Sequence, residues 1–434
     1  MPFSDYTELS NFFVSLGVTR SFFKPLSEND NTKQQIYLGG SFQTLNQIPF
    51  GRIRVENESG KTNYKAAVEL WWVTDTGETA LAPHTQLILY PKYPEVRLSG
   101  FIRECPVAPS GYLQPVQQKH RTGFDGRILI FGITILRRVY AFLAPPDSPV
   151  ARSIISDGLL NQEASGVFLH FPLGKDLDGR KKLISRLREI IDFGWHSSRR
   201  LDKHGNILQY KAQNGGGYTL EALLGIIPNG ISEPDFMGWE LKAFSQDRIT
   251  LMTPEPDSGY YGEKGVEAFV RRFGHDAGND TLYFTGVHKA ASKNESTGMI
   301  LQLQGFDLKS EKITDPSGGI ALVTEIGDNA AKWSFGPLLE HWGRKHAQTA
   351  YIKFSKQEIR KFPHYSYSNR VWFGEDTNFS MFLKGLAESI IFLDPASKIM
   401  AASTLHSKVK ARSQFRIIFR NINRLYGHFI EFKI

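Results

Sequence analysis

The chain has 434 residues, with 52 lysine and arginine residues against 44 aspartate and glutamate residues, so its formal net charge is +8 and its pI is near 9.2. Its hydrophobic content of 41% excludes a disordered chain, and its single cysteine, Cys105, excludes an intrachain disulfide and a cysteine-based zinc cluster. The length favours two domains. Without a secretory leader or an apolar run of membrane length, we expect a cytoplasmic protein with no membrane partner.

The first part of the chain has the pattern of a mainly-β domain. A helix is predicted over residues 6–16, ending at Gly17, and another over residues 150–160. Short runs rich in β-branched and aromatic residues, separated by turn residues, predict strands over 67–73, 86–90, 127–136 and 139–143. This spacing is typical of a barrel or sandwich, so we predict a β-barrel-like domain with flanking helices over residues 1–165.

The pattern changes after a boundary within residues 161–176. Residues 181–193 have apolar side chains at helical spacing and stop at Gly194, and helices then alternate with strands to the end. This predicts an α/β or α+β domain over residues 172–434. Residues 396–434 contain eight lysines and arginines against one acid, Glu431, which suggests a polyanionic partner.

The most informative residues lie between 215 and 244. Asp235 follows a turn-rich segment, and five residues later Glu240 and Lys242 share one face of a strand predicted over 239–244. Two carboxylates suit Mg²⁺, and a nearby lysine can orient a water or stabilise charge on a phosphate. This is the arrangement that metal-dependent phosphodiester cleavage requires. The alternative is that Glu240 and Lys242 are solvated strand residues.

A short helix precedes this strand. Thr219 is predicted as its N-cap, with Glu221 in the first turn and Gly225 at the end. Glu221 could be an accessory acid of the site, or an acid that only interacts with the helix dipole. No Gly-Lys-Ser/Thr follows the run Gly215–Gly217, so a phosphate-binding loop is excluded.

These residues resemble the MvaI/BcnI family of restriction endonucleases, and the resemblance extends over residues 179–434. The matching segments, in order, are Gly194-Trp195-His196, Thr219-Leu220-Glu221-Ala222-Leu223-Leu224, Pro234-Asp235-Phe236 with Glu240-Leu241-Lys242, Trp333-Ser334-Phe335, and Phe415-Arg416-Ile417. The resemblance implies an α/β, MutH-like PD-(D/E)XK nuclease core. It also implies that Asp235 and Glu240 bind Mg²⁺, that Lys242 is the catalytic lysine and that Glu221 is an accessory acid.

The same resemblance implies a function. We expect a monomeric type II restriction endonuclease that cuts both strands of double-stranded DNA at a short C/G-rich site such as CCWGG, CCSGG or CCNGG. A cognate DNA methyltransferase is expected in the same system, but not as a physical partner. The expected DNA contacts of this domain are Arg416, which suits guanine, His406, which could equally be structural, and Arg412, Lys410, Arg199 and Arg200.

The N-terminal domain resembles the DNA-binding effector domain of EcoRII-type enzymes, a β-pseudobarrel with two DNA-contacting arms. The resemblance is carried by residues 24–30, followed by residues 35–38. It implies arms over residues 24–35 and 90–103 that bind a second copy of the site, with the contacts Lys24, Asn29, Lys92, Glu95, Arg97 and Arg103. Alternatively, residues 91–94 form an ordinary turn and Arg97 is a charge on a strand face.

Two other functions remain open from the sequence. One is a MutH-like nicking enzyme or a modification-dependent DNA endonuclease. The other is a DNA-binding protein without catalytic activity, although the intact Asp235, Glu240 and Lys242 argue against the loss of activity.

Overall fold

The computed structural model describes residues 2–27, 35–40, 42–58, 61–93, 95–113, 124–162, 164–173, 179–227 and 235–434. The chain divides into two compact units. The first comprises residues 1–189 with 233–240, and the second comprises residues 190–232 with 241–434. The domain limits expected from the sequence, 1–165 and 172–434, stay a prediction.

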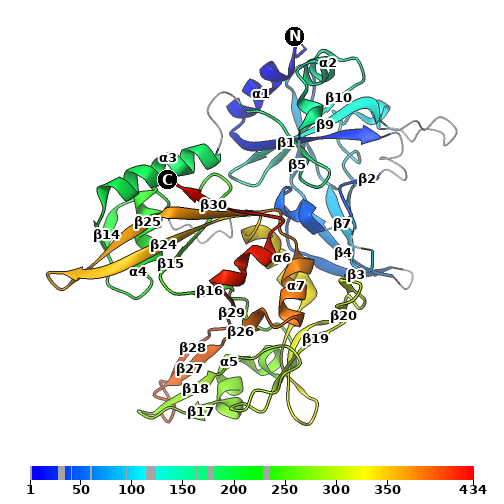
Figure 1. Cartoon of the computed structure of the whole chain (residues 1–434). Coiled ribbons are helices and arrows are strands. Elements are labelled where there is room, and N and C mark those ends of the chain that lie inside the picture. Colours follow the sequence, from blue (N-terminus) through cyan, green and yellow to red (C-terminus); the bar gives the residue numbers. More distant parts are fainter. Residues whose placement is uncertain are drawn as a thin grey trace. The chain divides into compact units, whose positions relative to one another are not determined.

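Ahead of residue 179, the described part of the first unit contains two β-sheets and the helices α1 and α2 (Figure 1). A six-stranded sheet has the order β11-β1-β9-β10-β5-β6, and a five-stranded sheet has the order β2-β8-β7-β4-β3. The described strand pairs of both sheets are antiparallel except β10 with β5. The elements are α1 (Tyr6–Ser15), β1 (Val18–Ser27), β2 (Gln35–Tyr37), β3 (Arg54–Glu58), β4 (Lys61–Ala67), β5 (Leu70–Val73), β6 (Thr79–Ala82), β7 (Gln86–Tyr90), β8 (Glu95–Ser99), β9 (Phe124–Thr134), β10 (Val139–Ala144), α2 (Pro149–Ser156) and β11 (Leu169–His170).

The predicted N-terminal helix is confirmed. The side chain of Asp5 accepts a hydrogen bond from Glu8 N at 2.8 Å, which caps the start of α1, and Gly17 follows the helix with a φ of 80°. The strands predicted over 86–90 and 139–143 are β7 and β10. The mainly-β character expected from the spacing of strands and turns is therefore present, and the pseudobarrel stays a prediction.

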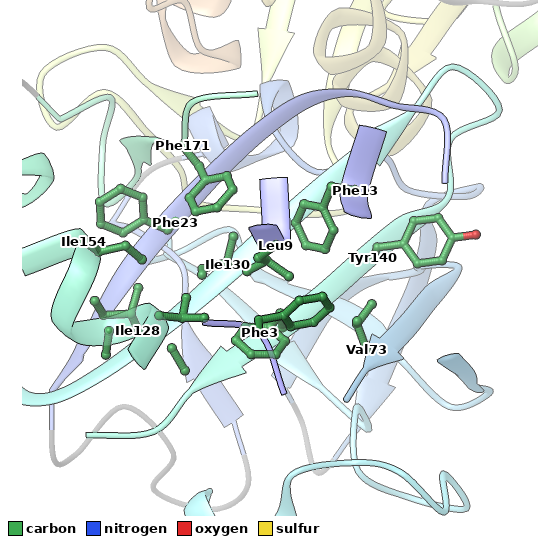
Figure 2. Packing of buried hydrophobic residues seen from close by; sticks show 14 of the residues in the cluster. Phe3, Leu9, Phe13, Phe23, Val73, Ile128, Ile130, Tyr140, Ile154 and Phe171 are labelled. Carbon is green, nitrogen blue, oxygen red and sulfur yellow. The ribbon is translucent and has the colours of Figure 1, made fainter. Parts of the chain in front are cut away.

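One apolar cluster joins the helices to the six-stranded sheet (Figure 2). Leu9 and Phe13 of α1, Ile130 of β9 and Ile154 of α2 are fully buried in it. Gly132 of β9 lets α1 approach closely, because a Cβ at this position would lie 2.8 Å from the ring of Phe13. The helices thus pack their apolar side chains against the six-stranded sheet.

From residue 179 to the C-terminus, helices are interspersed with small sheets. One sheet has the order β12-β25-β24-β15, with β30 also paired to β25. The elements are α3 (Gly179–Phe193), β12 (His196–Ser197), β13 (Arg199–Leu201), β14 (Ile207–Gln209), α4 (Gly215–Leu223), β15 (Glu240–Phe244), β16 (Arg248–Met252), α5 (Gly259–Phe273), β17 (His275–Asp276), β18 (Thr281–Thr285), β19 (Ile300–Gln304), β20 (Phe306–Asp307), β21 (Lys312–Ile313), β22 (Gly319–Val323), β23 (Asn329–Ser334), α6 (Phe335–Lys345), β24 (Gln348–Ile359), β25 (Phe362–Glu375), α7 (Phe379–Ala387), β26 (Ile391–Leu393), β27 (Ala396–Met400), β28 (Lys408–Lys410), β29 (Phe415–Ile418) and β30 (His428–Lys433).

The helix predicted over 181–193 is confirmed as α3, and the strand predicted over 239–244 is confirmed as β15. The β12–β25, β24–β25 and β25–β30 pairs run antiparallel, a direction that the sequence pattern did not specify. Within the described ranges, no helix has the length and hydropathy needed to cross a lipid bilayer.

Candidate active site

The segment from Asp235 to Glu240 is a tight β-hairpin. Phe236 N donates to Trp239 O at 2.9 Å, and Trp239 N donates to Phe236 O at 2.8 Å. Between them, Met237 and Gly238 have φ values of 45° and 92°, as a two-residue type I′ turn requires. Phe236 and Trp239 form an isolated β-bridge, and Asp235 and Glu240 are the residues directly outside it. The hairpin therefore gives a physical reason for the four residues that separate the two acids.

Helix α3 begins against this turn. A Cβ at Gly179, the first residue of α3, would lie 2.7 Å from Met237 O. Only glycine allows so close an approach, because a larger side chain would push the hairpin away from the helix. Trp239 also anchors the hairpin, since only 2% of its surface is exposed.

Glu240 and Lys242 both lie on β15, next to β24 in the sheet. In a strand, alternate residues project to the same face, so these two side chains share one face. Only 4% of Glu240 is exposed, whereas Lys242 is half-buried. The alternative of a solvated glutamate at position 240 is therefore wrong.

Thr219 is not the N-cap of α4, so that prediction is wrong. The helix begins at Gly215 after Asn214, and Thr219 is fully buried inside it. Its hydroxyl accepts a hydrogen bond from Arg199 N at 3.1 Å, so tertiary packing overrides its preference for a helix start. Glu221 consequently lies beyond the first turn, where an acid gains little from the helix dipole.

Helix α4 is held close to β25. Tyr367 of β25 donates its hydroxyl to Gly216 O at 2.8 Å. Burial raises the pKa of Tyr367 well above its usual range, and the nearby Glu221 carboxylate acts in the same direction, so the phenol stays neutral and able to donate. A Cβ at Gly215 would lie 2.5 Å from the hydroxyl of Tyr365. Gly215 thus permits close packing of α4 against β25.

The donor set suits a hard cation. Among the described residues, no group of three or more His, Cys, Asp or Glu side chains is arranged to hold a metal ion. Mg²⁺, however, is commonly held by one or two carboxylates with waters and substrate phosphates. Asp235 and Glu240, which directly flank the Phe236–Trp239 pair, are chemically matched to that role.

The residues expected to contact DNA in the C-terminal part occupy different environments. His406, Lys410 and Arg412 are exposed along the segment that contains β28. Arg416 lies on β29 and is ion-paired, with its Nη1 2.9 Å from an Asp394 carboxylate oxygen.

Near α4, Arg199 and Arg200, which were both predicted to contact DNA, lie in different environments. The guanidinium of Arg199 donates to Ser197 O and Oγ at 3.1 and 2.9 Å. Arg200 is exposed and lies 5.6 Å from the ring centroid of Tyr210.

The residues expected in the N-terminal arms also differ. Arg97 is held by Glu95, whose carboxylate accepts from Nε at 2.9 Å, and by Gln35 at 3.3 Å. Lys92 and Arg103 are exposed, whereas Lys24 is buried in β1 with 5% of its surface exposed. Asn29 lies outside the described residues.

Two features of the structure were not anticipated from the sequence. Asp394 pairs with both Arg248 and Arg416, at 3.1 and 2.9 Å. Nothing in the sequence links these distant residues. The turn at Met237–Gly238 carries one signal, the glycine, but methionine at a left-handed position is uncommon.

Comparison with known proteins identifies the family. The model of the MvaI/BcnI restriction endonuclease family matches residues 184–426, more than half of the chain. A solved complex of restriction endonuclease MvaI with cognate DNA substrate is 20% identical, with a TM-score of 0.45, and covers 58% of this chain and 98% of its own. MvaI in the absence of DNA is 17% identical, with a TM-score of 0.34, and covers 58% and 97%. No curated protein matches the chain. The chain belongs to the MvaI/BcnI restriction endonuclease family and is a site-specific DNA endonuclease.

Proposed function

We propose that this chain is a type II restriction endonuclease that makes Mg²⁺-dependent double-strand cuts at a short C/G-rich site of the CCWGG, CCSGG or CCNGG kind. It acts as a monomer on double-stranded DNA, and its N-terminal domain binds a second copy of the site. The observation that carries the nuclease proposal is the two-residue turn whose closing pair, Phe236 and Trp239, is flanked directly by Asp235 and by Glu240, the first residue of the strand that bears Lys242. These residues fall within the range that matches the family.

Asp235 and Glu240 would hold the Mg²⁺ ion. When bound, the ion would polarise the scissile phosphate and lower the pKa of a water. The hairpin and the buried neighbours of Glu240, Trp239 and Leu241, limit the freedom of the carboxylates, so little ordering remains to be done when DNA binds. The ammonium group of Lys242, on the same strand face, stabilises charge that develops on the phosphate. Glu221 serves as an accessory acid.

The effector role of the N-terminal domain has two supports. Its two sheets and apolar cluster precede residue 184, where the family match begins. Arg97 lies 5.6 Å from the ring centroid of Tyr90 and is also held by Glu95 and Gln35, so its guanidinium is ordered in advance. An ordered arginine loses less conformational entropy when it binds a phosphate or a base.

The test is digestion of a supercoiled plasmid with Mg²⁺ or with EDTA. Lys242→Ala should lower the cleavage rate by at least about 100-fold, because it removes charge stabilisation in the transition state, while DNA binding persists. Lys309→Ala, at an exposed lysine between β20 and β21, is the matched control and should cleave normally. Normal cleavage by Lys242→Ala would refute the assignment of Lys242.

The same digestion tests the finer parts of the proposal. Plasmids with two copies of the site, or with an added site-containing duplex, should be cut faster than single-copy plasmids if an effector site exists. Products that stop at the nicked circle would favour a MutH-like nicking enzyme instead. Cleavage confined to methylated plasmid would favour a modification-dependent enzyme.

A further inference from the structure

The long hairpin of β24 and β25 ends in an unusual turn (Figure 1). The pairing runs to Ile359 opposite Phe362, so Arg360 and Lys361 alone form the turn. Their φ values are 50° and 62°, both in the left-handed region. Such two-residue turns strongly favour Asn-Gly, because other side chains are strained there. Residues with strained backbone conformations cluster at functional sites.

The tip of this hairpin is also rich in positive charge. Residues 355–364 contain three lysines and arginines and one acid, which gives a net charge of +2. All three cations are exposed: Lys356, Arg360 and Lys361. Lys211 adds a fourth exposed cation beside the tip, since its Nζ lies 5.5 Å from the ring centroid of Phe362.

The hairpin is tightly packed where it joins the rest of the second unit. Tyr365 and Tyr367 of β25 are buried, and the Phe354 ring packs edge-on against Tyr365 with centroids 5.4 Å apart. Gly216 of α4 lies against Phe354, because a Cβ there would overlap the ring. The helix that carries Glu221 therefore packs directly on the hairpin, which holds its cationic end in a defined place.

We propose that Arg360 and Lys361 contact the sugar–phosphate backbone of the DNA, an inference that rests on the proposed function. An arginine can bind a phosphate with two parallel hydrogen bonds, and a lysine binds it as a point charge. Phosphate contacts fix the register of a protein on DNA without reading its sequence. The backbone shape of this turn favours Asn-Gly. A role for the Arg360 and Lys361 side chains in DNA binding explains why these two residues occupy the turn instead.

The test replaces Arg360 and Lys361 together by Asn and Gly in the full chain. This variant keeps the turn and removes both charges. Its binding to a random-sequence duplex in EDTA is measured by fluorescence anisotropy between 50 and 300 mM NaCl. The slope of log K against log salt concentration should be smaller in magnitude by about 2 than that of the wild-type chain. At 0.1 M salt, this loss corresponds to an affinity lower by roughly 60-fold. The Tm should be equal or higher, because the turn strain is removed.

Arg360→Lys combined with Lys361→Arg is the matched control, and it should keep the wild-type salt slope. An unchanged slope in the Asn-Gly variant would overturn the proposal. Digestion of plasmid by the wild-type chain with Mg²⁺ distinguishes this failure from a failure of the proposed function, since the salt slope is measured in EDTA and does not depend on cleavage. A loss of slope in both double variants would also overturn the proposal, because the charge would then not be the cause.

Discussion

The pairing of Asp235 with Glu240 depends on the length of one turn, and this can be tested by inserting a glycine between Met237 and Gly238. In the two-residue turn, the two acids directly flank the Phe236–Trp239 pair. One added residue moves a strand residue by about 3.4 Å and turns its side chain to the other face. Mg²⁺ requires ligands at about 2.0–2.1 Å, so the two carboxylates could no longer share one ion.

A misplacement of about 1 Å can lower a rate on the order of 100-fold. The insertion should therefore lower the single-turnover rate at saturating Mg²⁺ by at least about 100-fold, with little change in Tm. Met237→Gly is the matched control, because it keeps the two-residue turn. It should retain cleavage, since relief of about 1–2 kcal/mol of left-handed strain offsets the backbone entropy that glycine adds. A folded insertion variant that cleaves at the wild-type rate would refute the pairing of the two acids.

Two further predictions concern stability. Gly216→Ala should lower the free energy of unfolding, by about 1–3 kcal/mol from overpacking, because its Cβ would lie within 2.6 Å of Phe354 ring atoms. Gly217→Ala, in the same helix with no atom within 4 Å of its Cβ, should instead raise stability by up to about 1 kcal/mol. If urea denaturation gave the same free energy of unfolding for both variants, the packing of Gly216 against Phe354 would not be the cause. Burial lowers the pKa of His288 from 6.5 to about 4. The unfolded state therefore binds more protons between these pH values, so stability is lost as pH falls through this range, by about 2 kcal/mol at pH 5. Urea denaturation at pH 7.5 and pH 5 gives the free energy of unfolding at each pH. The difference between the two values should be smaller in His288→Gln than in wild type, and an equal difference would show that His288 is not the source of the pH dependence.

Local patterns in the sequence predicted most of the individual elements of the site. Alternation of apolar and polar residues marked β15 and placed Glu240 and Lys242 on one face, because strand periodicity is a local property. Glycines marked the ends of α1 and α3 for the same reason. The start of α4 was missed, because Thr219 makes its hydrogen bond to Arg199, a residue outside the helix.

The sequence alone determined the family motif, the two carboxylates and lysine, and the mainly-β character of the first part. These follow from the spacing of residue types along the chain. Only the tertiary structure decided that Glu240 is buried, that Arg416 is paired with Asp394, and that two strained cations form the tip of the β24–β25 hairpin. Burial, ion pairing and turn conformation depend on contacts between distant segments, and composition and periodicity carry no record of such contacts.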